Sequence, residues 1–285
     1  MRPASRLVVV LVAVLAAGCD RPEAIVICHN SNCVEPPDPS RDDSIESLRE
    51  SLALEIDGRP VLDGVEIDLF WFGAQDRCIF AHDLADPASS VPAAEVATEL
   101  ANYIAGPEPL SWNGERFTVF IELKAHVGPS KSDAHSPQQR IDHASCAISV
   151  LQTLDEAAFT NDRDVEVIFI SFDPRLFTAL VSHIDWPINT LRVERRLGAT
   201  IGIPAPLDSQ THSLDEFPPA LDIDLVEVHP DWLTEGQYEA YVHADYDLAF
   251  WMFSATAEIF DSIERYEPST VVTNEARLMR RWLEY

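Results

Sequence analysis

Lysine is nearly absent from this chain of 285 residues, occurring only at Lys124 and Lys131. Lysine and arginine together number 20 against 48 aspartate and glutamate residues, so the formal net charge is −28. Because no basic stripe is present to neutralise a polyphosphate, we expect no binding to nucleic acid. Such an acidic protein also repels free anions unless a cation sits in its site, so a lysine at a special position is informative.

Several common motifs are missing as well. The first apolar run is not followed by Gly-x-Gly-x-x-Gly, which argues against a dinucleotide site, and no Gly-x-Ser-x-Gly indicates a serine hydrolase. There is no Cys-x-x-Cys and no zinc-like spacing of cysteine with histidine. The cysteines beyond the N-terminal segment are therefore interpreted as one or two structural disulfides of open pairing: Cys28, Cys33, Cys78 and Cys146.

The N-terminus has the pattern of a processing segment. Arg2 and Arg6 precede an unbroken apolar run at residues 7–17, which is too short to span a bilayer as a helix. Small residues then lead to Cys19, a pattern that resembles a bacterial lipoprotein signal. We expect residues 1–19 to be a signal ending at a lipidated Cys19, with an ordinary secretory signal as the alternative. The protein would then be exported and reach the membrane through the lipid anchor only.

Apolar β-type runs alternate with helical patterns along residues 24–285, which we expect to form a single domain. Hydrophobic residues make up 46% of the chain, enough for a substantial core. Eight strands with intervening helices favour an α/β fold of the (β/α)8 TIM-barrel type over a doubly wound open sheet. The expected strands cover residues 24–28, 65–70, 117–123, 165–171, 190–193, 225–228, 248–253 and 270–273, and residues 78–81 are expected to form a hairpin with the second.

Carboxylates stand where the second and third strands end. Glu66 and Asp68 are two residues apart and therefore share one face of a strand, and Glu122 ends the next long strand. The carboxyl ends of barrel strands converge, so three carboxylates would repel one another there unless they hold a hard divalent cation through oxygen. The sequence thus predicts a metal site at Glu66, Asp68 and Glu122.

Histidines and a lysine follow the same strand ends. His29 follows the first strand, His82 ends the hairpin partner, and Lys124 shares a face with Glu122. Two histidines beside a cation can give and take protons near neutral pH. The remaining histidines, apart from His229 at the end of the sixth strand, are expected at the surface: His126, His135, His143, His183, His212 and His243.

The order of these residues resembles that of the glycerophosphodiester phosphodiesterases, within the wider superfamily of phospholipase-C-like barrel phosphodiesterases. The resemblance covers roughly residues 29–285 and is strongest at residues 64–68, 80–83 and 120–124. It implies that the three carboxylates hold Mg²⁺ or Ca²⁺, that His29 and His82 are the acid and base in an order left open, and that Lys124 meets the phosphate. It also implies that Trp251 lines the alcohol side of the pocket.

Two segments depart from the family pattern. Asn30 stands where the family usually has arginine, so we expect Asn30 to meet the substrate. Residues 41–44 replace the family's Pro-Glu-Asn-Thr segment, which leaves its glutamate missing or shifted to Asp42 or Asp43.

The expected function is metal-dependent hydrolysis of a small phosphodiester, most simply a glycerophosphodiester cleaved to sn-glycerol-3-phosphate and an alcohol. One alternative is a phospholipase of the same fold acting on a phosphoinositide or sphingolipid headgroup, with Trp71, Phe72 and Trp232 in loops that form an apolar rim. Others are an inactive barrel used as a surface binding protein, and a lipid-anchored sugar-binding or structural protein. Retention of the carboxylates and histidines argues against the last two.

Overall fold

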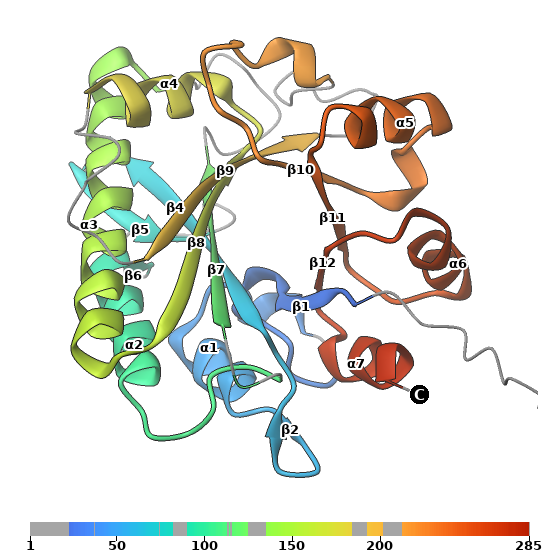
Figure 1. Ribbon diagram of the computed structural model, residues 1–285. Helices are drawn as coiled ribbons and strands as arrows, with labels where there is room; N and C mark the ends of the chain where they lie inside the picture. The colour runs from blue at the N-terminus through green and yellow to red at the C-terminus, as the bar shows by residue number, and fades with distance from the viewer. Residues whose placement is uncertain are drawn as a thin grey trace, which may run out of the picture.

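The computed structural model describes residues 23–36, 38–73, 75–81, 90–112, 114, 116–124, 135–183, 193–201 and 213–284. Within these residues, eight parallel strands close into a barrel because β1 pairs with both β12 and β4 (Figure 1). The predicted (β/α)8 fold is therefore confirmed. The barrel strands in chain order are β1 Ile25–Cys28, β4 Gly64–Phe72, β7 Arg116–Lys124, β8 Asp164–Ser171, β9 Glu194–Ile201, β10 Leu225–Val228, β11 Asp247–Met252 and β12 Thr270–Thr273.

Helices surround the barrel and bury their apolar faces against it (Figure 1). Helix α3 begins with a capping box, in which Ser136 and Gln139 satisfy each other's backbone N–H groups. The helices are α1 Ile45–Leu52, α2 Ala93–Ile104, α3 Pro137–Asn161, α4 Pro174–His183, α5 Glu235–His243, α6 Ala257–Tyr266 and α7 Ala276–Glu284. Of the described helices, none combines the length and apolarity needed to cross a bilayer.

Side chains alternate strictly between the barrel interior and the helical layer. An apolar plug fills the lower interior with Ile27, Phe120, Ile168, Ile170, Leu225, Ala249 and Val272. On several strands, the interior position two residues after the plug is polar. Ile27 of β1 is followed in this way by His29, and Phe120 of β7 is followed by Glu122. The plug therefore forms the floor of a polar mouth at the carboxyl ends of the strands.

Strand β4 extends beyond the barrel as an antiparallel ribbon with β5 Arg77–Phe80 and β6 Val91–Pro92. A small separate hairpin is formed by β2 Glu55–Ile56 and β3 Arg59–Pro60. Trp71 and Phe72 belong to the ribbon, where they pair with Cys78 and Arg77. The prediction that these two aromatic residues lie in a loop above the second strand is therefore wrong.

The four described cysteines form two disulfides. Cys28 pairs with Cys33, closing the turn after β1, and Cys78 of β5 pairs with Cys146 of α3. The second bond fastens the ribbon to a helix that is 68 residues away in sequence.

The fifth barrel strand lies later in the sequence than predicted. It is β9, whereas the predicted segment 190–193 falls mostly outside the described residues. The first part of β9 is charged, so the prediction, which followed apolar and β-branched runs, did not include it. In the barrel, Arg196 lies 3.6 Å from Glu166 of β8 and also pairs with Asp247 of β11, so other strands supply its counter-charges.

Two histidines predicted at the surface are buried. His143 of α3 is fully buried and His135 is 7% exposed, with their rings in edge contact and His135 against Phe70. The His135 Nε2 atom lies 2.9 Å from the backbone oxygen of Trp71. Burial lowers the pKa of His143 to about 3, so its imidazole is neutral and packs as a core ring.

Candidate active site

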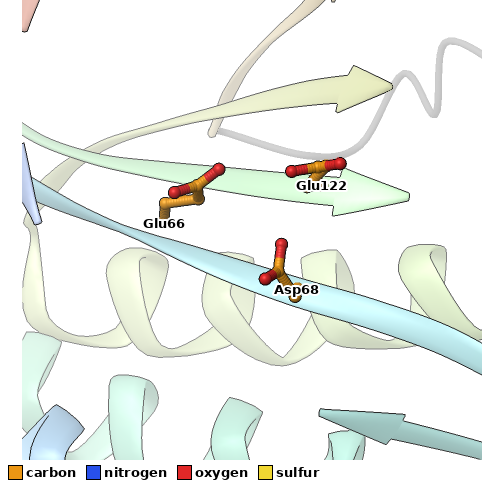
Figure 2. A group of neighbouring side chains, drawn as sticks. All are labelled: Glu66, Asp68 and Glu122. Atoms are coloured by element: carbon orange, nitrogen blue, oxygen red, sulfur yellow. The ribbon is translucent and has the colours of Figure 1, made fainter. Parts of the chain in front are cut away.

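Three buried carboxylates converge at the mouth of the barrel. Glu66 and Asp68 project from β4 and Glu122 from β7, with the carboxylate groups turned toward one another (Figure 2). The register pairs Asp68 directly with Glu122, because β4 and β7 are parallel neighbours. One oxygen from each residue lies within 4.8 Å of the others. Alternation along β4 therefore brings the predicted trio together as the sequence pattern indicated.

The trio has a single lysine as its nearest cation among the described residues. Lys124 Nζ lies 2.6 Å from Glu122 Oε2 and 3.3 Å from Asp68 Oδ1. Burial raises the pKa of Glu66 to about 8, with the charge of Glu122 adding to the effect. Burial also raises the pKa of Asp68 to about 6, although Lys124 opposes the shift. One lysine therefore compensates these charges only in part.

These residues fit a hard divalent cation. A cation bound about 2.5 Å from each oxygen needs ligand oxygens no more than about 5 Å apart, and the trio meets that limit. Asp68 Oδ2 is buried and has no hydrogen-bond partner among the described residues. Buried oxygens without a donor are costly unless a ligand completes them, so the donor set suits Mg²⁺ or Ca²⁺.

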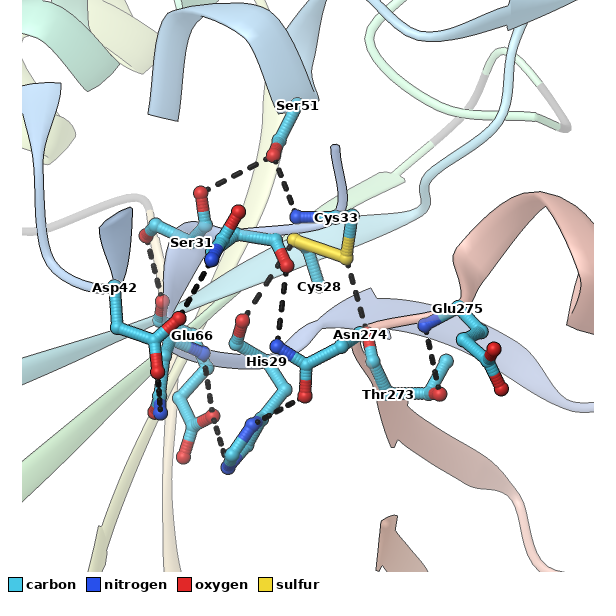
Figure 3. The surroundings of a disulfide bond; sticks show 12 residues. Cys28, His29, Ser31, Cys33, Asp42, Ser51, Glu66, Thr273, Asn274 and Glu275 are labelled. Carbon is cyan, nitrogen blue, oxygen red and sulfur yellow. Dashed lines mark hydrogen bonds and ion pairs between the residues drawn. A yellow bond between two sulfur atoms is a disulfide. The ribbon is translucent and has the colours of Figure 1, made fainter. Parts of the chain in front are cut away.

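His29 lies beside the carboxylates in a defined orientation. Its Nε2 is 3.7 Å from Glu66 Oε2, and its Nδ1 is 2.9 Å from Asn274 Oδ1 (Figure 3). The Asn274 amide donates through Nδ2 to the backbone oxygen of Asn32, so its Oδ1 must accept from the imidazole. The proton therefore sits on Nδ1, and Nε2 is left as the nitrogen that can take up a proton.

Asn30 shapes the turn that follows β1. Its φ of 47° lies in the left-handed region, which asparagine tolerates better than most residues. This turn points the Asn30 backbone N–H at Glu66 Oε2, 3.2 Å away. Its side chain donates to Asp42, which also accepts a 2.6 Å hydrogen bond from Asn32. Asp42 thus approaches this turn from the segment that departs from the family pattern.

Four aromatic side chains at the carboxyl ends of β10 and β11, His229, Trp232, Trp251 and Phe253, form an aromatic wall that reaches His29. His229 stacks on Trp232, and Trp251 meets both rings edge-on. Phe253 contacts Trp251 and His29, with ring centroids 5.6 Å and 5.3 Å apart, and is 59% exposed. The wall offers apolar surface next to the polar mouth, which suits the organic part of a ligand.

Sequence reasoning missed Glu227, a fourth carboxylate of the mouth. It lies on β10 between Leu225 and His229 and is 2% exposed. Burial, together with the charges of Glu66 and Glu122, raises its pKa well above the ordinary value. The alternation of Leu225, Glu227 and His229 toward the interior was the signal that could have revealed it.

Contacts at the end of β8 serve the framework, and two predicted residues lie outside the described structure. Ser171 donates to the backbone oxygen of Leu123, and Asp173 is paired with Arg175. His82 and Cys19 fall outside the described residues.

Comparison with known proteins bears on this arrangement. No family model and no curated protein matches the chain. Among solved structures, a phosphodiesterase from Oleispira antarctica in complex with the product sn-glycerol-3-phosphate superposes with a TM-score of 0.58 at 12% identity, covering 92% of this chain and 97% of its own. The chain has the fold of the glycerophosphodiester phosphodiesterases.

Two further enzymes with this fold support that statement. A glycerophosphodiester phosphodiesterase from Agrobacterium tumefaciens gives a TM-score of 0.52 at 13% identity, covering 90% of this chain and 99% of that one. The corresponding enzyme from Thermotoga maritima gives 0.51 at 15% identity, covering 91% and 98%. The resemblance inferred from the motifs is thus confirmed at the level of the fold.

Proposed function

We propose that this protein is a metal-dependent phosphodiester hydrolase that cleaves glycerophosphodiesters to sn-glycerol-3-phosphate and an alcohol. The observation that carries the proposal is the buried trio Glu66, Asp68 and Glu122 beside Lys124 and His29. The sn-glycerol-3-phosphate named as product in the Oleispira antarctica structure supports the choice of substrate.

Each residue has a role in the proposed reaction. Glu66, Asp68 and Glu122 would hold the cation, which would supply positive charge to neutralise the phosphate, and Lys124 adds a second positive charge. His29 Nε2 takes a proton from the attacking water, while Asn274 fixes the imidazole through Nδ1. As the bond from phosphorus to the leaving oxygen breaks, His82 gives that oxygen a proton. The aromatic wall contacts the leaving alcohol.

Release of sn-glycerol-3-phosphate from glycerophosphocholine by the purified protein tests the proposal. We expect release that depends on Mg²⁺ or Ca²⁺, stops on chelation and is lost in His29→Ala. The matched control is His243→Ala, which removes an exposed histidine from α5 and should leave the rate unchanged. Release that survives both chelation and His29→Ala would show that another site performs the reaction.

Exposed Phe253 favours a second candidate, hydrolysis of a lipid headgroup. A side chain 59% exposed beside His29 could touch an acyl chain. Trp71 and Phe72 give this candidate less support than expected, because they pair within the ribbon. If lipid is the substrate, vesicles will be cleaved faster than glycerophosphocholine, and Phe253→Ser will remove that advantage. We expect the soluble diester to be cleaved faster.

We also propose that the protein is exported and anchored to the cell envelope through a lipidated Cys19. The signal-like sequence at residues 1–19 supports this location, as do the two disulfides, which persist in oxidising compartments. The experiment is fractionation of cells that express the full chain. The protein should enter the membrane fraction, and Cys19→Ala should release it.

A further inference from the structure

Two buried carboxylates outside the mouth have arginine partners. Asp63 is paired with Arg280, which is itself buried. Glu166, on the interior of β8 near the opposite end of the barrel, lies 3.9 Å from Arg116 and 3.6 Å from Arg196. An ionised carboxylate inside a protein requires such compensation, because its desolvation costs several kcal/mol.

Glu227 repeats the setting of Glu166 without the arginines. Thr118 donates to Glu166 from the neighbouring strand, and Thr200 donates in the same way to Glu227 Oε2 at 2.9 Å. The other oxygen of Glu227, Oε1, is buried and has no hydrogen-bond partner within the described part of the chain. No arginine or lysine of the described residues forms an ion pair with Glu227 within 4.0 Å. Among the described residues, the barrel thus gives Glu166 arginine partners at one end and gives Glu227 none at the other.

The charges of the mouth indicate what kind of partner Glu227 would have. Glu66, Asp68, Glu122 and Glu227 are all buried, and Lys124 is the lysine that contacts this group. When all four carboxylates are ionised, as cation binding requires of its ligands, one divalent cation together with Lys124 compensates three of them. The remaining negative charge would repel a phosphodiester anion that enters the same mouth.

We propose that Glu227 binds a second cation, adjacent to the one held by Glu66, Asp68 and Glu122. The inference rests on the metal site of the proposed function and extends it to a pair of cations. Glu227 offers an unpartnered carboxylate oxygen, the donor type that hard cations take, and Thr200 orients the carboxylate through its other oxygen. Two cations would place an anionic phosphate in a mouth that is no longer negative.

The experiment counts Mn²⁺ ions bound to the metal-stripped full-length protein by equilibrium dialysis and records their electron paramagnetic resonance spectrum. We expect two ions per chain in the wild-type protein, with the broadened spectrum of two coupled ions. Glu227→Gln keeps the shape of the side chain and should bind one ion with an uncoupled spectrum. Glu166→Gln, which neutralises the arginine-paired glutamate, should still bind two.

The wild-type count is informative even if a variant fails to fold. One ion per wild-type chain would overturn the second site while leaving the proposed metal-dependent function intact. Two ions retained in a folded Glu227→Gln variant would also overturn it, because Glu227 would then not be a ligand. Absence of any bound Mn²⁺ would count against both the second site and the metal dependence of the proposed function.

Discussion

Glu66 combines complete burial with the charge of Glu122 close by, and these effects raise its pKa to about 8. Glu66→Gln removes a cation ligand and a repelling charge in one step. We therefore expect hydrolysis to fall about 100-fold or more, with an unchanged or higher midpoint of thermal unfolding. The two measurements are the rate of glycerophosphocholine hydrolysis and the unfolding curve of the metal-free protein.

Glu166→Gln provides the contrasting control for stability. Here the lost charge has arginine partners, so the substitution leaves Arg116 and Arg196 with one counter-charge fewer and should lower the unfolding midpoint. If Glu66→Gln remained active at normal cation concentration, or if it destabilised the fold as much as Glu166→Gln, Glu66 would be a structural residue.

Asn274 acts on the reaction through His29. Asn274→Ala removes the acceptor that holds Nδ1–H and lets the imidazole rotate, so we expect kcat to fall about 10- to 100-fold while KM changes little. Steady-state kinetics check this expectation, and Asn274→Asp, which keeps an acceptor in place, should recover part of the rate. A rise in KM at constant kcat would instead place Asn274 in substrate binding.

At the scale of strands and helices, predictions succeeded where one pattern governed a whole element. Strand β4 alternates acidic with apolar residues, so its two carboxylates and their shared face followed directly from the sequence. Strand β9 begins with Glu194, Arg195 and Arg196. Glu194 and Arg196 find their ion-pair partners on β7, β8 and β11, which come close to them only in the folded barrel. A prediction based on apolar and β-branched runs therefore did not include this segment.

Contacts between elements that are distant in sequence also explain why Glu227 and the burial of His143 were not predicted. Glu227 belongs to the mouth because β10 lies across the barrel from β4 and β7, a relation that one strand's sequence does not contain. The burial of His143 depends on the ribbon that packs over α3. Alternation predicts which face a side chain occupies, whereas tertiary contact decides what it meets there.

The two disulfides constrain elements over very different chain lengths. Cys78 and Cys146 are 68 residues apart and join β5 to α3, whereas Cys28 and Cys33 are 5 apart. Loop-closure entropy predicts a loss of about 4 kcal/mol when the longer loop is opened and about 2 kcal/mol for the shorter one. Thermal or urea unfolding of Cys78→Ala/Cys146→Ala and of Cys28→Ala/Cys33→Ala measures the difference. An equal loss in both double variants would contradict the expected dependence on loop length.

For the whole molecule, the net charge of −28 makes recognition of an anionic substrate depend on local cations. Described arginines compensate carboxylates at the amino ends of the strands, as Arg116 and Arg196 do for Glu166. At the carboxyl ends there are four buried carboxylates, and Lys124 contacts two of them, Glu122 and Asp68. This asymmetry indicates that bound cations neutralise the charge of the mouth. The stability of the protein should therefore depend on both the pH and the cation concentration.

The sign of that dependence follows from the raised pKa values. On folding, the pKa of Glu66 rises from 4.5 to about 8 and the pKa of Asp68 rises from 3.8 to about 6. At a pH between the unfolded and the folded pKa of each residue, the native state therefore holds more protons than the unfolded state. Their contribution to stability is therefore complete at low pH and is lost as pH rises toward 8. Without a cation, the unfolding midpoint of the wild-type protein should fall more steeply from about pH 5 to pH 8 than that of Glu66→Gln.

A bound cation should reverse this trend, because it competes with protons for the same oxygens. At a Ca²⁺ concentration 100 times the dissociation constant, binding stabilises the fold by about 2.7 kcal/mol, which raises the midpoint by about 5 to 10 °C. We expect that increase near pH 8, a much smaller one near pH 5, and little response of Glu66→Gln at either pH. Differential scanning calorimetry with and without Ca²⁺ measures all three. An equal rise at both pH values, or an undiminished rise in Glu66→Gln, would mean that Ca²⁺ binds elsewhere, since only ligands with raised pKa values make its affinity increase over this range.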